Sequence, residues 1–243
     1  MAVTQKKELI SIEPLKKKLV TVKIIGESPL IVHNWDVKAQ REILEKEMGI
    51  KKLTKMTKNP YEDFAASMYW LDPMPDEITK DSLDAAVDAG ARFGFPLTGI
   101  KQAAISAAFR MGWSKDKASL RGVFFIEPTA NGYYSGDMEI SDDQKRIDII
   151  PNVFHPEPMV KLDFERVSMR RDMVRVGMGS ADIRYRGEFS NWSAEFTLSY
   201  NENGERSIDQ ILTMLNAGGY VCGIGEWRPE KDGQYGMFHV EGI

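Results

Sequence analysis

The chain has 243 residues, 42% of them hydrophobic and 28% charged, and this ordinary composition excludes a disordered or low-complexity protein. Its 32 Lys and Arg against 36 Asp and Glu give a formal net charge of −4, so any anion-binding surface must be local. With one cysteine, Cys222, the chain cannot form an internal disulfide, which indicates a reducing compartment.

The hydropathy pattern predicts a protein that does not enter a membrane. The first twenty residues contain lysines but no apolar segment of signal-peptide length, and no stretch approaches 18 uncharged apolar residues. We therefore expect a cytoplasmic protein, with residues 1–243 forming a single domain and no membrane among its partners.

The first half of the chain combines one strand with helical patterns. Leu19 to Ile25 is rich in β-branched residues, which predicts a buried strand. Asp36 stands where the N-cap of a helix would, and Gly49 would end that helix. A lysine-rich stretch over 51–60 then leads into a second helical pattern at 61–71.

Two further helices are expected before residue 113. The acidic segment 76–90 predicts a short helix that faces solvent. Pro96 and Thr98 precede an alanine-rich stretch that ends at Gly112. Because its side chains are small, this second helix should pack closely against a sheet.

From Gly122 onward the pattern changes mainly to strands. The segment 192–200 alternates cleanly, with Trp192, Phe196 and Leu198 on the face expected to be core. The other predicted elements are strands at 123–128, 133–140, 146–150 and 237–241, and a helix that begins after Ser207.

Residues 161–187 are locally basic within an acidic chain. Guanidinium groups bind phosphate oxygens bidentately and remain charged, and Tyr185 and Phe189 would stack on unpaired bases. The segment therefore predicts a clamp for a phosphate backbone, although charge runs are also typical of a solvated, salt-bridged strand pair. Its cations are Lys161, Arg166, Arg170, Arg171, Arg175, Arg184 and Arg186.

A glycine-rich segment lies between the last helix and the last strand. A dinucleotide-binding motif would follow a strand and open a helix, whereas here a helix precedes the glycines and Pro229 follows them. The glycines would let backbone N–H groups approach a phosphate, with Arg228 and Lys231 as charged partners, or they form an ordinary long turn. They are Gly223, Gly225, Gly233 and Gly236.

The histidines offer one catalytic candidate. His33 and Asp36 follow the first strand, where a loop would present a base and an acid to a ribose hydroxyl or a scissile phosphate, although a cap or surface role is the commoner one. His239 lies in a predicted strand and is expected to be structural. No Ser/His/Asp, P-loop, HExxH or zinc-type pattern is present, so neither a cofactor nor a metal is expected.

In this order, these features resemble the RAMP superfamily, the repeat-associated RNA-binding proteins that build CRISPR effector complexes, and especially their backbone subunits. Residues 217–240 are similar to that family's glycine-rich loop, although Glu226, Glu230 and Asp232 make this one less basic. Residues 95–110 are similar to its Pro-Gly/Ser-Ser-Leu-Lys-Gly-x-x-Arg helix opening, with Pro96, Thr98, Gly99, Lys101 and Arg110 in the corresponding positions.

The resemblance implies an α+β fold, with a ferredoxin-like, RRM-related antiparallel sheet and helices on one face. The segments of about 33–95 and 128–187 would be two long insertions that grip a strand and touch neighbouring subunits. Asp36 falls near the position of the catalytic carboxylate in target-cleaving members. The pattern also looks like RAMP-like proteins of phages and prophages.

Three functions are open at this point. The leading hypothesis is a non-catalytic protein that binds RNA or single-stranded DNA and forms a homo-oligomer, or joins effector-complex subunits, along the strand. The alternatives are a metal-independent endoribonuclease that uses His33, and a phage-type protein-interaction or inhibitor module. The cations expected to hold phosphates are Lys101, Arg110, Arg166, Arg170, Arg171, Arg175, Arg184, Arg186, Arg228 and Lys231.

Overall fold

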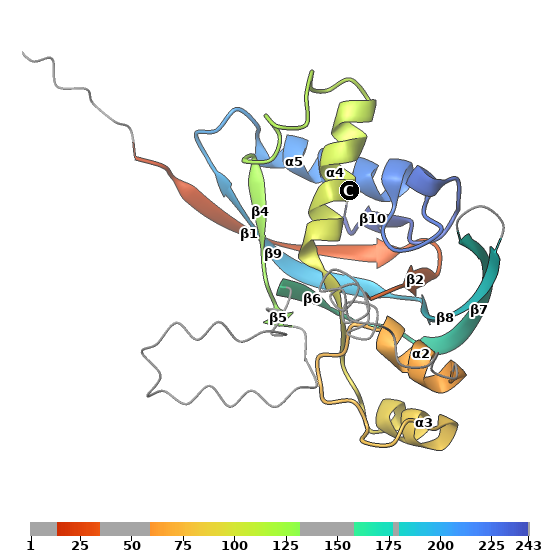
Figure 1. Ribbon diagram of the computed structural model, residues 1–243. Coiled ribbons are helices and arrows are strands. Elements are labelled where there is room, and N and C mark those ends of the chain that lie inside the picture. Colours follow the sequence, from red (N-terminus) through yellow and green to blue (C-terminus); the bar gives the residue numbers. More distant parts are fainter. Residues whose placement is uncertain (1–13, 35–58, 132–157, 177–179, 243) are drawn as a thin grey trace, which may run out of the picture.

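The computed structural model describes residues 14–34, 59–131, 158–176 and 180–242 (Figure 1). Within these ranges the protein is α+β, and all its paired strands are antiparallel, as the sequence predicted. The predicted helix that follows Asp36, nearly all of the lysine-rich stretch, and the predicted strands at 133–140 and 146–150 lie outside the described residues.

The largest sheet has four strands in the order β10-β1-β9-β4. These strands are β1 (Lys17–Gly26), β4 (Phe124–Glu127), β9 (Ser193–Asn201) and β10 (Phe238–Val240). Val22 pairs with Phe196, and the predicted inward face of β9 is buried: Ala194, Phe196 and Leu198 are at most 1% exposed. The strands predicted at 19–25, 123–128, 192–200 and 237–241 are thus confirmed.

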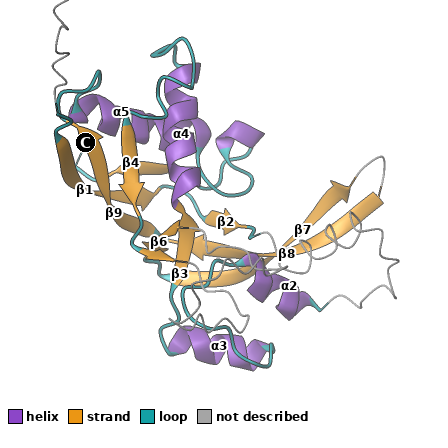
Figure 2. Ribbon diagram, turned by 60° about the vertical axis from the view of Figure 1, so that its left-hand side comes forward, coloured by secondary structure: helices purple, strands orange, loops and turns teal. Residues whose placement is uncertain are grey.

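Two helices cover one face of this sheet, α4 (Leu97–Arg110) and α5 (Ile208–Ala217), as Figures 1 and 2 show. The buried alanines of α4 let other elements approach closely: a Cβ added at Gly218 would lie 2.7 Å from the backbone nitrogen of Ala104. Gly218 opens a π-helical turn, η1 (Gly218–Cys222), that continues α5. Ser207 and Gln210 form the capping box that starts α5.

Two further sheets have the order β2-β8-β7 and β3-β6-β5, and they consist mostly of residues from the segments predicted as insertions, although β2 precedes the first of these segments. An aromatic cluster of Trp70, Phe93, Phe164 and Phe189 joins them. The strands are β2 (Leu30–Val32), β3 (Phe93–Pro96), β5 (Ala130–Asn131), β6 (Pro158–Leu162), β7 (Arg166–Val176) and β8 (Ser180–Ser190), and the helices are α2 (Pro60–Ser67) and α3 (Lys80–Asp88).

Two details differ from the sequence predictions. The helix predicted over 61–71 ends at Ser67, because Met68 is extended and Trp70 forms a β-bridge with Phe93. The expectation that Phe189 would stack on a base is wrong, because Phe189 is fully buried within the aromatic cluster. Among the described helices, none combines the length and apolar character needed to cross a membrane.

The arginine-rich segment forms the β7–β8 hairpin, which extends away from the rest of the molecule (Figure 2). Paired residues share a face of a hairpin, so one face carries the even-numbered residues and the other the odd-numbered ones. Near its base the odd-numbered face packs on α2, where a Cβ on Gly187 would lie 2.6 Å from Met68. The even-numbered face contacts the C-terminal loop through Asp172 and Trp227.

Candidate nucleic-acid interface

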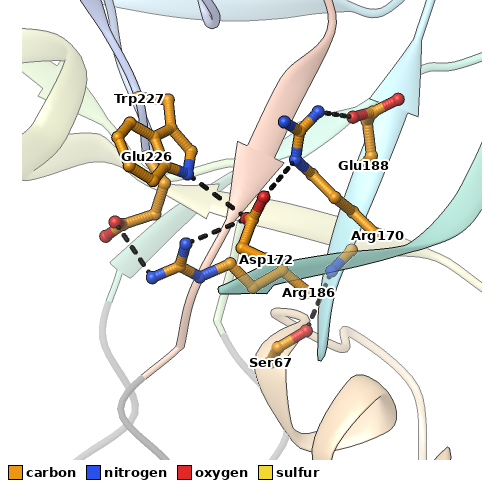
Figure 3. A network of polar contacts seen from close by, with 8 residues as sticks. Ser67, Arg170, Asp172, Arg186, Glu188, Glu226 and Trp227 are labelled. Carbon is orange, nitrogen blue, oxygen red and sulfur yellow. Dashed lines mark hydrogen bonds and ion pairs between the residues drawn. The ribbon is translucent and has the colours of Figure 1, made fainter. Parts of the chain in front are cut away.

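At the base of the hairpin, Asp172 accepts hydrogen bonds from three side chains (Figure 3). Arg170 Nε donates at 2.8 Å, Arg186 Nη1 at 3.1 Å and Trp227 Nε1 at 3.2 Å. Arg170 also donates to Glu188 at 2.7 Å. Burial raises the pKa of Asp172, but the hydrogen bonds from the two arginines outweigh it and keep that pKa below its ordinary value.

Arg186 is 2% exposed and makes a second ion pair, at 3.3 Å, with Glu226 of the glycine-rich loop (Figure 3). Arg170 lies over the ring of Tyr235 in the same loop, 4.6 Å from its centroid. Both guanidinium groups are therefore neutralised by carboxylates inside the molecule. The expectation that Arg170 and Arg186 hold phosphates is corrected: they fasten the hairpin to the C-terminal loop.

In the outer part of the hairpin, unlike at its base, the arginines are not paired with described carboxylates. Arg171 and Arg175 lie exposed on the odd-numbered face, and neither has an ion pair with a carboxylate that the structure describes. Tyr185 pairs across from Arg171. Between the two arginines is Met173, whose 78% exposure is unusual for a large apolar side chain.

Two other predicted arginines, Arg166 and Arg184, occupy the even-numbered face of the hairpin. Arg166 is exposed at the start of β7, and Arg184 is half-buried opposite Asp172. The six arginines therefore do not form one cluster. Two are locked at the base, two share the odd-numbered face, and two are on the opposite face.

The remaining predicted cations do not join the hairpin arginines. Lys101 packs over the ring of Phe125 at 4.0 Å, where burial lowers the pKa of the lysine. This contact lies at β4, on the opposite side of the view in Figure 1 from β7 and β8. Arg110, at the end of α4, makes an ion pair with Glu230 at 3.2 Å, and Lys231 is exposed in the short 3₁₀ turn η2 (Pro229–Lys231).

A cavity of about 300 Å³ lies between the start of α4 and the glycine-rich loop. Gly223, Gly225 and Gly236 adopt positive φ, between 64° and 76°. At Gly225 a Cβ would lie 2.3 Å from the carbonyl oxygen of Ile31, so only glycine lets the loop approach β2 this closely. Gly233 is required for a different contact, because a Cβ added at this position would lie 1.7 Å from the carbonyl oxygen of Trp227.

The charged groups along this cavity are already engaged. Arg228 donates to the carbonyl oxygen of Gly225 at 2.8 Å and to Glu230 at 3.2 Å. Glu230 also accepts from Arg110, and Glu226 is paired with Arg186. Since these ion pairs neutralise Arg228, the prediction that it holds a phosphate loses its support here.

His33 contributes to the wall of the same cavity, and its carbonyl oxygen accepts a 3.4 Å hydrogen bond from Tyr69. Asp36, its proposed catalytic companion, lies outside the described residues. The other histidine among the described residues, His239, makes an ion pair with Glu27 at the edge of the large sheet. The structure thus places one catalytic candidate beside the glycine-rich loop.

Two polar residues of the cavity wall, Tyr69 and Gln102, were not predicted from the sequence. A helical signal was available for Gln102, which follows Thr98 by four residues on α4 and therefore shares its face. No sequence signal marks Tyr69, because its position depends on how the segment after α2 crosses β3.

No family model matches the chain, and no curated protein matches it. Among the described residues, no group of three or more His, Cys, Asp or Glu side chains is arranged to hold a metal ion.

Proposed function

We propose that the protein binds single-stranded RNA or DNA with the odd-numbered face of the β7–β8 hairpin. The observation that carries the proposal is the composition of that face. Arg171 and Arg175 have no ion pair with a carboxylate that the structure describes, and the half-buried Tyr185 and the exposed Met173 lie beside them on a projecting ribbon. Guanidinium groups bind phosphates, while aromatic and apolar side chains contact unstacked bases.

The charge of the rest of the molecule favours a local contact. With a net charge of −4 the chain as a whole repels a polyanion, so affinity has to come from a small cationic surface. Bases are accessible to side chains such as Tyr185 in a single strand, whereas a duplex hides them within its stack. A single strand is therefore the nucleic acid that fits this face best.

The topology supports the proposed membership of the RAMP superfamily. Taken along the chain, β1, α4, β4, β9, α5 and β10 follow the order β-α-β-β-α-β, with the sheet order β10-β1-β9-β4. Ferredoxin-like domains have the same β-α-β-β-α-β order of elements, which favours this proposal. On the same resemblance we propose a cytoplasmic protein whose copies associate along the strand.

Fluorescence anisotropy with labelled 20-nucleotide RNA and DNA of mixed sequence, in about 50 mM salt, tests the proposal. Wild-type protein should bind, and the double variant Arg171→Ala/Arg175→Ala should bind at least about tenfold more weakly, because two charge-assisted contacts are lost.

The matched control is Lys115→Ala/Arg121→Ala, which removes the same charge from two exposed positions between α4 and β4. It should bind like the wild type. Failure of the wild type to bind any single strand, or an equal loss in both double variants, would contradict the proposal. Co-purification of a stoichiometric protein without nucleic acid would instead favour the protein-interaction alternative.

One observation keeps the endoribonuclease as a second candidate: His33 lines the cavity beside the glycine-rich loop. An imidazole is a general acid or base. If this activity exists, wild-type protein should cleave RNA in the presence of EDTA and His33→Ala should not. Intact RNA with the wild type, or equal cleavage by His33→Ala, excludes it.

A further inference from the structure

The cavity beside the glycine-rich loop has the size and lining of a site for a small, flat, polar group. Its volume of about 300 Å³ lies at the lower end of the usual range for small-molecule sites. Phe95 and Ile224, which are both buried, provide an apolar surface, and Gln102 and Glu226 provide polar groups.

The charges of the cavity argue against a phosphate. Both carboxylates on its wall, Glu226 and Glu230, would repel an anion. The guanidinium on its wall, that of Arg228, is bound to Glu230 and to the Gly225 carbonyl oxygen. A neutral group with hydrogen-bond donors is the better occupant.

Glu226 has an acceptor to offer such a group. Its Oε2 is held by Arg186 at 3.3 Å, whereas its Oε1 has no partner among the residues that the structure describes. The side chain is 39% exposed, so the fixed carboxylate remains accessible. A carboxylate oxygen accepts well from the exocyclic amine of cytosine, and it faces the carbonyl oxygen of uracil unfavourably.

We propose that this cavity takes one unstacked nucleobase that carries an exocyclic amino group, with Glu226 accepting a hydrogen bond from the amine. The inference rests on the proposed function, since the hairpin would hold the strand that delivers the base. Its consequence is selectivity: the hairpin binds any sequence, and the cavity discriminates cytosine from uracil.

The test compares labelled rC12 with rU12, because the two bases differ at position 4 in having an amine or a carbonyl. Wild-type protein should prefer rC12 by about threefold to tenfold, as expected for one net hydrogen bond. Glu226→Gln should bring this ratio close to one, because an amide serves both bases. Glu202→Gln is the matched control, since Glu202 is an exposed carboxylate paired with Lys18.

The outcomes separate this inference from the proposed function. Arg171→Ala/Arg175→Ala should weaken both strands by the same factor and leave the ratio unchanged. If both strands bind equally and still depend on the arginines, the cavity inference is wrong and the proposed function stands. A preference for rC12 that persists in Glu226→Gln also overturns the inference. If wild-type protein binds neither strand, the proposed function itself fails.

Loss of structure in Glu226→Gln would be visible as a lower affinity for rU12 as well. The ratio is therefore the decisive quantity, because a general destabilisation of the loop would lower both affinities together. A variant that keeps its affinity for rU12 and loses its preference for rC12 supports a base contact at Glu226.

Discussion

The base and the outer part of the β7–β8 hairpin both contain arginines, but only those at the base are paired with carboxylates that the structure describes. At the base, Arg170 and Arg186 share Asp172 and are paired with further carboxylates. In the outer part, Arg171 and Arg175 have no carboxylate partner among the described residues. The comparison shows that the role of an arginine here is set by the carboxylates within its reach.

The position of the carboxylates follows from strand geometry. Side chains alternate between the two faces of a strand, so Arg170 and Asp172 share a face that Arg171 does not. The even-numbered face at the base turns toward the C-terminal loop, which supplies Glu226 and Trp227. Four predictions test this difference between the two parts, in order of decreasing effect.

Asp172→Ala should cause the largest loss of stability. It leaves two guanidinium groups close together at the base without their shared carboxylate, and removing one partner of a buried ion pair costs about 3–5 kcal/mol. Urea unfolding followed by circular dichroism measures the change. Asp84→Ala on α3 is the control and should have little effect, because its pair with Lys80 is exposed. A similarly small effect for Asp172→Ala would show that the base is not a structural clamp.

Acid should weaken the base of the hairpin selectively. The folded-state pKa of Asp172 lies below 3.8, its ordinary value, because the hydrogen bonds from Arg170 and Arg186 outweigh the effect of burial. Its contribution to stability is therefore complete above the unfolded pKa and is lost as the pH falls through the folded one. The difference in unfolding free energy between wild type and Asp172→Asn should be large at pH 7 and shrink below about pH 4. A difference that does not change with pH would argue against this ion pair.

Trp227→Phe should have an intermediate effect. The variant loses the 3.2 Å hydrogen bond from the indole N–H to Asp172, which is worth about 1 kcal/mol. Trp113→Phe makes the same change in ring size where the indole N–H donates to no residue that the structure describes. Thermal unfolding should therefore show a larger loss of stability for Trp227→Phe than for Trp113→Phe. Equal losses would show that the hydrogen bond from Trp227 to Asp172 does not stabilise the protein.

Arg171→Ala/Arg175→Ala should have the smallest effect on stability. Both side chains are exposed and neither forms an ion pair within the described ranges, so the free energy of unfolding should stay within about 0.5 kcal/mol of the wild type. Chemical denaturation measures it. A loss above 2 kcal/mol would mean that these arginines support the fold, as those at the base do.

Local patterns were sufficient to predict most of the large sheet and its helices. The alternation over 192–200, the β-branched residues of 19–25 and the capping residue Ser207 are each contained within one element. The end of α2 was not predictable in this way. It depends on the β-bridge between Trp70 and Phe93, which are far apart in the sequence.

The candidate interface was predicted only in part, for the same reason. The sequence locates the arginines of 161–187 but not their partners. Arg186 meets Glu226 across forty residues, and Phe189 is buried by the aromatic cluster of three other segments. The alternation along β7 separates Arg170 from Arg171, but the face that is covered depends on where the C-terminal loop packs.

The salt dependence of single-strand binding tests the central claim most directly. Each contact between a cation and a phosphate contributes about −0.7 to the slope of log Kobs against log salt concentration for a single strand. Arg171→Ala/Arg175→Ala should therefore make the slope less steep by about 1.4, while Lys115→Ala/Arg121→Ala should leave it unchanged. An unchanged slope in the hairpin variant would show that the outer arginines do not contact the nucleic acid.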